Sequence, residues 1–345
     1  MKILGIESSC DETAAAIVED GAKILSNVVV SQIDIHAEYG GVIPEIAARS
    51  HIEAINPVLH KALADANLTL DDIDAIAVTH TPGLVGSLLA GTLAARTLAV
   101  LHDKLFYPTH HLKSHIYANW LSGHTPEFPL LAAVISGGHT QIIYMEHHDH
   151  FEIIGTTRDD AIGECFDKVA KILGLPYPGG PSIATAAANG DPDKYHLPIP
   201  KVDGLDFSFS GLKTAVLRAV QKELGLPITT PSHELQNHLS EQQVNDFAAS
   251  FQKTAVDILI RKLQTAATDH PVKSILLAGG VSANQLLRQE LERNFAKTHQ
   301  VYFPEPKFST DNGAMVASAA YFSIQSGEQA TDPYQLDISP RSQIQ

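Results

Sequence analysis

The order of predicted elements in this chain repeats once, and this repeat restricts the fold more than any other feature of the sequence. The first half opens with three strand-like runs, "KILGIES", "TAAAIVED" and "KILSNVVVSQ". A helix from about Pro44, a buried strand "IDAIAVTH", a long helix through Leu98 and a short strand near Phe106 follow. The second half, from "LLAAVISGGHTQIIYM" to "VYFPEPKFSTDNGAMVASAAYF", has the same order. This duplication predicts a two-lobed α/β protein with ligands in the cleft between related lobes.

The repeat also predicts where each lobe begins and ends. We expect a first lobe over residues 1–125 and a second lobe over residues 126–345, with an insertion in the second lobe at about 176–241. In this plan the helix at His111 has its counterpart in the helix beginning near Asp311. The starts of these two helices should therefore face each other across the cleft.

Composition excludes several classes of protein. The apolar run "LLAGTLAARTLAVL" is interrupted by Arg96, and Glu7 and Asp11 come too early for a signal-peptide core, so we expect a cytoplasmic protein without a membrane partner. Cys10 and Cys165 are the only cysteines in the sequence, which excludes a disulfide framework and an all-cysteine metal site. Any metal must be bound by histidine and carboxylate.

The net charge of −15 argues against a protein that binds nucleic acid by bulk electrostatics. An RNA substrate would require a local basic patch or a partner protein.

A histidine pair in "PTHHLKSHIY" indicates a metal site. The spacing of His111 and His115 places both imidazoles on one face of a helix, about one turn apart. In "FSTDNGAM" a helix cap is the default interpretation, but the duplication places Asp311 where its carboxylate can join the pair. Two histidines and one carboxylate with open positions suit Fe(II) or Zn(II).

Four loops at related positions favour a nucleotide site: "GIESSCDET", "ISGGHTQ", "YPGGPSI" and "AGGVSANQLL". Each is also compatible with an ordinary tight turn. In the functional interpretation, glycines let the backbone approach an anion, while hydroxyls and amides contact phosphate. Asp11, Glu12 and His139 are the candidate acid–base residues of these loops.

These motifs, together with "HAEYGGVIPEIAARSH", "TPGLVGSLLAG", "GECFDKVAKILGLPYPGGP" and "LDFSFSGLKT", resemble the TsaD family of tRNA adenosine threonylcarbamoyltransferases over essentially the whole chain. The resemblance implies an actin-like ATPase and sugar kinase fold. It also implies transfer of a threonylcarbamoyl group from threonylcarbamoyl-AMP to the exocyclic amine of the adenosine 3′ of the anticodon, position 37, in tRNAs reading ANN codons. Any of the three candidate acid–base residues can take the amine proton, and Asp11 is our choice.

The resemblance assigns the family's metal, usually iron, to His111, His115 and Asp311. It assigns nucleotide binding to Ile135, Ser136, Gly137, Gly138, His139, Asp167, Gly180 and Asn284. Two positions depart from the family pattern: Ala184 stands where many bacterial members have an acidic residue, and Thr81 where glycine is common.

Bacterial members of the family act with an inert paralogue, TsaB, and an ATPase, TsaE. The helix from Pro44 carries an apolar stripe, Ile52, Ile55, Leu59 and Leu63, which either packs on its own sheet or docks onto the paralogue.

Three other functions compete with this interpretation. A small-molecule kinase of the same superfamily would share the nucleotide loops, but it has no need for a histidine pair opposite an aspartate. A zincin-type peptidase needs glutamate after its first histidine, where this chain has Leu112. A non-enzymatic scaffold has no need to retain the metal residues. The histidine-rich stretch "EHHDH" is predicted to be a solvated turn.

Overall fold

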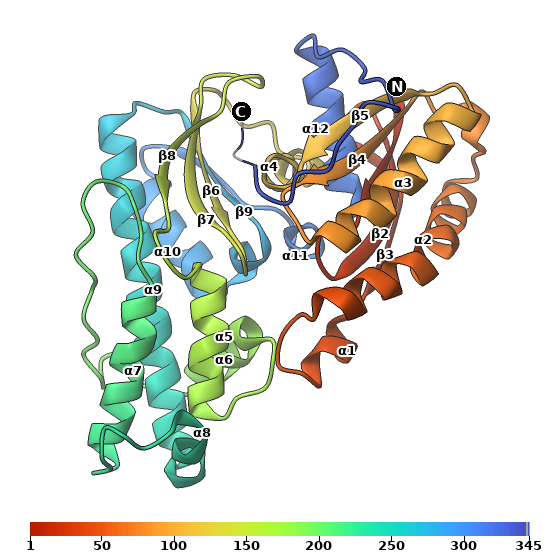
Figure 1. Cartoon of the computed structure of the whole chain (residues 1–345). Helices are drawn as coiled ribbons and strands as arrows, with labels where there is room; N and C mark the ends of the chain where they lie inside the picture. Colours follow the sequence, from red (N-terminus) through yellow and green to blue (C-terminus); the bar gives the residue numbers. More distant parts are fainter. Residues whose placement is uncertain (343, 345) are drawn as a thin grey trace. The chain divides into compact units, whose positions relative to one another are not determined.

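A computed structural model of the protein describes residues 1–342 and 344 (Figure 1). The chain divides into two compact units. Unit 1 consists of Met1–Phe128, Met145–Glu152 and Tyr302–Gln345, and unit 2 of Pro129–Tyr144 and Ile153–Val301.

Unit 1 is built on a five-stranded mixed sheet. Its strands are β1 (Lys2–Glu7), β2 (Glu12–Glu19), β3 (Lys23–Ser31), β4 (Ala75–Thr81) and β5 (Leu105–His110). The order across the sheet is β3-β2-β1-β4-β5, with β1, β2 and β3 antiparallel to one another in turn and β1, β4 and β5 parallel. Runs of buried alanine, isoleucine and valine form the central strands, as expected for a sheet covered on both faces.

Helices cover both faces of this first sheet (Figure 1). Leu4 and Ile6 of β1 pack with α2 (Pro44–Ala66) and α3 (Val85–Leu101), whereas Ile3 packs on the opposite face with α4 and α12. This alternation follows from the two-residue period of a strand. The remaining helices of unit 1 are α1 (Ile33–Ala37), η1 (Leu70–Asp72), α4 (His111–Leu121), α11 (Pro306–Ser309) and α12 (Gly313–Gln325).

The second sheet repeats the topology of the first. Its strands are β6 (Leu130–Ile135), β7 (Thr140–Met145), β8 (Glu152–Thr156), β9 (Ser274–Ala278) and β10 (Gln300–Tyr302), in the order β10-β9-β6-β7-β8. Strand β6 takes the place of β1, and β6 and β9 are parallel just as β1 and β4 are. The predicted duplication is confirmed.

The segment 176–241, where the insertion is expected, has helices over Gly179–Ala187, Ser210–Glu223 and Ser232–Leu235, joined by long stretches without regular secondary structure. The helices of unit 2 are α5 (Ile162–Leu173), α6 (Gly179–Ala187), α7 (Ser210–Glu223), α8 (Ser232–Leu235), η2 (Gln236–His238), α9 (Glu241–Asp269), η3 (Gly280–Ala283) and α10 (Gln285–Phe295). Among the described residues, no helix is both long and apolar enough to span a bilayer.

The C-terminal segment belongs to unit 1, which differs from the expected division into 1–125 and 126–345. Helix α12 lies so close to β1 that a Cβ atom added at Gly5 would lie 2.2 Å from the carbonyl oxygen of Gly313. This contact requires glycine at position 5. Through it, α12 covers the same face of the first sheet as α4. Asp311 therefore shares a unit with His111 and His115, and the predicted metal ligands do not come from one lobe each.

Two surface predictions also differ from the structure. In α2 the predicted stripe is divided, because Ile55 and Leu59 pack on the sheet while Ile52 is 67% exposed.

The "EHHDH" turn is not fully solvated: the ring of His148 stacks on Phe322 with centroids 4.5 Å apart, and the hydroxyl of Tyr117 lies 3.0 Å from Nδ1 of His148.

Candidate functional site

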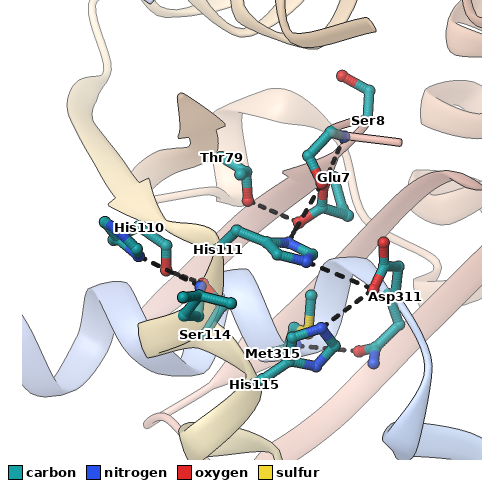
Figure 2. A network of polar contacts seen from close by, with 12 residues as sticks. Glu7, Ser8, Thr79, His110, His111, Ser114, His115, Asp311 and Met315 are labelled. Carbon is teal, nitrogen blue, oxygen red and sulfur yellow. Dashed lines mark hydrogen bonds and ion pairs between the residues drawn. The ribbon is translucent and has the colours of Figure 1, made fainter. Parts of the chain in front are cut away.

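Two histidines and an aspartate converge in unit 1 (Figure 2). Strand β5 ends at His110 and α4 begins at His111, so His115 follows one helical turn later. Oδ1 of Asp311 lies 3.1 Å from Nε2 of His115 and 3.7 Å from Nε2 of His111. The three candidate ligand atoms lie within 4.8 Å of one another, so the predicted trio is brought together.

The start of α12 leaves the Asp311 carboxylate available for this cluster. Oδ1 of Asn312 accepts a hydrogen bond from the amide of Met315 at 3.0 Å, and its Nδ2 donates to the carbonyl of Thr310 at 2.8 Å. Asn312 is therefore the residue that caps α12. The prediction that "FSTDNGAM" caps a helix is confirmed. Because Asn312 is the cap, the neighbouring Asp311 can face the histidines.

The burial of His115 supports metal binding at this cluster. The side chain is 1% exposed, and within the described part of the chain neither ring nitrogen has a hydrogen-bond partner of acceptable geometry. A buried imidazole in that state is unfavourable unless another group satisfies it. Tetrahedral bonds of about 2.0–2.1 Å would separate ligand atoms by roughly 3.3 Å, close to the 3.1 Å between His115 and Asp311. The residues fit a divalent cation.

Glu7 is a further residue of this cluster that the sequence did not reveal. It ends β1, is fully buried, and its Oε2 lies 3.1 Å from Nδ1 of His111. Burial by itself raises the pKa of Glu7, but the charge and hydrogen bond of His111 outweigh it and hold that pKa below its ordinary value. Burial lowers the pKa of His111, whereas Asp311 and Glu7 together raise it to about 9. The only sequence signal for Glu7 is a carboxylate that closes the buried strand "KILGIE".

His110, the remaining histidine of "PTHHLKSHIY", has a structural role. Its Nδ1 accepts a hydrogen bond from the amide of Leu112 at 3.2 Å and caps α4, while its Nε2 lies 3.2 Å from the carbonyl oxygen of Ser342. Its own carbonyl accepts a bond from the Ser114 hydroxyl at 3.3 Å (Figure 2). His110 therefore defines where α4, the helix of the two predicted histidine ligands, begins.

The turn between β1 and β2 carries Asp11 and Glu12, but its serines point inward. The Ser8 hydroxyl donates to the carbonyl of Ser87 at 2.8 Å, and Oγ of Ser9 lies 3.2 Å from Nδ1 of His111. Both serines are buried, which differs from the expectation that these hydroxyls contact phosphate.

Glu12 has an unusual protonation state for a candidate base. Burial, followed by the charges of Asp311 and Asp11, raises the pKa of Glu12 to about 10, although the Ser31 hydroxyl donates to its Oε1 at 3.0 Å. A carboxyl group with this pKa is protonated at neutral pH. It can act as a base only after a cation has offset the neighbouring negative charge.

The predicted nucleotide-binding residues all lie in unit 2. They occupy the end of β6 (Ile135), the β6–β7 turn (Ser136, Gly137, Gly138 and His139), the middle of α5 (Asp167), the first turn of α6 (Gly180) and the N-cap of α10 (Asn284). His139, the third candidate acid–base residue, is therefore in a different unit from Asp11 and Glu12.

Close backbone packing connects these loops. A Cβ atom at Gly279 would lie 2.5 Å from the carbonyl oxygen of Ile135, and one at Gly163 would lie 2.8 Å from Cα of Gly137. Oδ1 of Asp167 accepts the amide of Gly179 at 2.7 Å, which joins α5 to the start of α6.

Three glycines of these loops have open space at the position where a side chain would begin. Among the described atoms, none lies within 4 Å of a Cβ built at Gly137, Gly138 or Gly180. These positions suit the approach of a ligand to bare backbone. Asn284 is used differently, because its Oδ1 caps α10 through the Leu287 amide and its Nδ2 donates to Gln252 at 2.9 Å.

Comparison with known proteins agrees with this arrangement. A family model described as "TsaD: tRNA N6-adenosine threonylcarbamoyltransferase" matches residues 23–318. Proteins named tRNA N6-adenosine threonylcarbamoyltransferase are similar over nearly the full length. The protein of Caldicellulosiruptor saccharolyticus is 47% identical, with 99% of this chain and 97% of that protein covered. The protein of Dehalococcoides mccartyi strain CBDB1 is 50% identical, with 99% and 98% covered.

Solved structures share the fold at much lower identity. HypF of T. kodakarensis is 13% identical with a TM-score of 0.63, covering 94% of this chain and 48% of that one. The activator of the 2-hydroxyisocaproyl-CoA dehydratase from Clostridium difficile is 12% identical with a TM-score of 0.53, covering 94% and 96%. With the repeated sheet topology, these likenesses confirm the two-lobed actin-like ATPase and sugar kinase fold. The family match, in turn, shows that the chain belongs to the TsaD family, the tRNA N6-adenosine threonylcarbamoyltransferases.

Proposed function

We propose that this protein transfers the threonylcarbamoyl group from threonylcarbamoyl-AMP to the exocyclic amine of the adenosine at position 37, 3′ of the anticodon, in tRNAs reading ANN codons. The observation that carries the proposal is the near-complete alignment with relatives named for this transfer. The convergence of His111, His115 and Asp311 supports it independently, since a small-molecule kinase of this fold does not require such a cluster.

One divalent cation would be held by these three residues, with Fe²⁺ as our first choice and Zn²⁺ as the alternative. Such an ion supplies stabilisation of negative charge on acyl or phosphate oxygens of the substrate. The raised pKa of Glu12 would fall beside this charge, so that its carboxyl group would lose a proton more readily.

Binding and placement are the main tasks of the other residues. Threonylcarbamoyl-AMP is a mixed anhydride, so AMP leaves readily and the enzyme gains most by positioning the amine. The glycine-lined positions of unit 2 would take the AMP part of the substrate. Asp11 is our proposed acceptor for the amine proton, with Glu12 and His139 as the other candidates.

A TsaB-like paralogue and a TsaE-like ATPase are the proposed protein partners, and the reaction would take place in the cytoplasm with tRNA. The net charge of −15 supports the need for partners in tRNA binding. An exposed apolar stripe supports docking of the paralogue on α3 and the adjoining part of α2. Its residues are Ile52, Val85, Leu89 and Leu93.

The decisive assay combines the purified protein with both partners, threonylcarbamoyl-AMP and unmodified tRNA, followed by nucleoside mass spectrometry. We expect threonylcarbamoyladenosine with wild-type protein and at least a tenfold lower yield with His115→Ala. A tRNA with guanosine at position 37 serves as the substrate control. Absence of the modified nucleoside with all components present would contradict the proposal, and phosphorylation of a small molecule instead would support the kinase.

A further inference from the structure

We infer that Glu7 is a positioning residue that holds His111 by its Nδ1 atom, so that Nε2 of the same ring is directed toward the metal. This inference rests on the metal site of the proposed function. It concerns a side chain that does not itself belong to the ligand trio, because Glu7 contacts the far nitrogen of the ring (Figure 2).

Three neighbouring groups can donate hydrogen bonds to the side chain of Glu7. This position therefore requires a side chain that only accepts hydrogen bonds. Its Oε1 accepts the amide of Ser9 at 2.6 Å, and its Oε2 accepts the hydroxyl of Thr79 at 2.7 Å. The imidazole of His111 is the third neighbour, at 3.1 Å from Oε2. An ionised carboxylate can accept from all three, since its two oxygens offer about four lone-pair sites.

When the ring of His111 is neutral, as metal binding requires, this arrangement selects one of its tautomers. A proton on Nδ1 completes the set of donors around the carboxylate, and Nε2 is then left with the lone pair that a metal ion requires. Nε2 faces the other two predicted ligands, since it lies 3.7 Å from Oδ1 of Asp311. The Oγ atom of Ser9, 3.2 Å from Nδ1, can accept from the same proton but carries no charge.

The location of Glu7 makes it a rigid support. It is the last residue of the central strand β1, and Thr79 is on the adjacent parallel strand β4. Both side chains are fully buried. The sheet therefore fixes the carboxylate, and the carboxylate fixes the ring.

Substitution Glu7→Gln tests the inference without a large change in shape. The new amide group places an NH₂ donor against one of three donating neighbours, which disturbs the support of His111. We expect Zn²⁺, added to metal-stripped protein in competition with a fluorescent chelator, to bind about 10–100-fold more weakly.

Two further variants make the test specific. Thr79→Val removes one donor to Oε2 without adding a conflicting one, and we expect a loss of Zn²⁺ affinity of about two- to fivefold. Asp246→Asn is the matched control, because Asp246 is a buried carboxylate of unit 2 that also accepts two hydrogen bonds. Its Zn²⁺ affinity should equal that of the wild type even if its melting temperature falls.

Zn²⁺ affinity within twofold of the wild type for both Glu7→Gln and Thr79→Val would overturn the inference. If Glu7→Gln does not fold, as judged by circular dichroism, Thr79→Val decides alone by the same criterion. Wild-type protein that binds Zn²⁺ but forms no modified nucleoside contradicts the proposed function and leaves the role of Glu7 intact, so the two failures are distinguishable.

Discussion

Oδ1 of Asp311 lies 3.1 Å from Nε2 of His115, although one residue is near the end of the chain and the other is in its first half. The contact exists because α4 and α12 pack together on the same face of the first sheet. Each residue therefore depends on a distant segment for its proposed role in metal binding.

Replacement of Asp311 with alanine should remove the metal from the protein. The two imidazoles remain, but the only carboxylate of the trio is lost, so we expect affinity to fall by more than about tenfold. The measurement is the metal content of anaerobically purified protein by mass spectrometry. Asp332→Ala, in an exposed turn of the same C-terminal segment, is the control and should retain full metal content. Equal metal content in both variants would exclude Asp311 as a ligand.

Substitution Gly5→Ala should destabilise unit 1. The added methyl group would meet the backbone of α12 at Gly313 and Ala317, which cannot move aside without displacing the helix. We expect a cost of about 1–3 kcal/mol in urea or thermal unfolding, together with lower metal content, because α12 begins two residues after Asp311. The control is Gly211→Ala, where no described atom lies within 4 Å of the new Cβ, and it should be neutral or slightly stabilising. Unchanged stability of Gly5→Ala would refute the close packing of β1 and α12.

The contribution of Asp159 to stability should depend on pH. Burial by itself raises the pKa of Asp159, but the Ser208 and Ser210 hydroxyls, with the Phe209 and Ser210 amides, hold that pKa below its ordinary value of 3.8. A carboxyl whose pKa is lower in the folded state stabilises the protein above its unfolded pKa. This stabilisation disappears as the pH falls through the folded pKa.

Asp159→Asn should therefore lower the melting temperature by about 2–4 °C at pH 7, corresponding to about 1 kcal/mol after allowance for solvent exposure. The difference from wild type should stay constant between pH 6 and pH 8 and shrink below about pH 4. Calorimetry over this range provides the measurement. A difference that persists unchanged at pH 3 would show that the ionised carboxylate is not the cause.

Substitution Leu93→Glu should weaken the proposed complex with a TsaB-like paralogue. Leu93 is 54% exposed on α3, so the change should alter the stability of the isolated protein by less than about 0.5 kcal/mol. A carboxylate buried in an apolar interface should reduce affinity by more than about tenfold, measured by sedimentation of the mixed proteins. Ile228→Glu, at a 70% exposed position in unit 2, should bind the paralogue as the wild type does. Equal loss in both variants would argue against docking on α3.

The order of strands and helices was predictable because it depends on hydrophobic periodicity, which is a local property. The runs that became β1 and β6, each followed by a polar turn and a second strand, showed the duplication directly. The metal trio was predictable for a different reason. Histidines at helical spacing are uncommon, and the duplication pointed to one particular aspartate.

Features that depend on tertiary contacts were not predictable in this way. Nothing near Glu7 in the sequence indicates that Thr79 and His111 will surround it. Periodicity placed Ile52 with Ile55 and Leu59, but it does not show how much of a stripe the sheet covers. The duplication likewise suggested that α12 belongs to the second lobe, whereas it packs in unit 1. The order of the repeat does not reveal this packing, which depends on the close approach of α12 to Gly5 in β1.

The division of unit 1 into separate segments has a consequence for synthesis of the protein. All residues of unit 2 leave the ribosome before Tyr302, whereas unit 1 lacks α12 and Asp311 until the last segment has emerged. Until then the nascent chain exposes the apolar face of the first sheet that α12 will cover, a surface that chaperones recognise. A translation product interrupted before Asp311 would contain the histidine pair of the proposed metal site and lack its carboxylate.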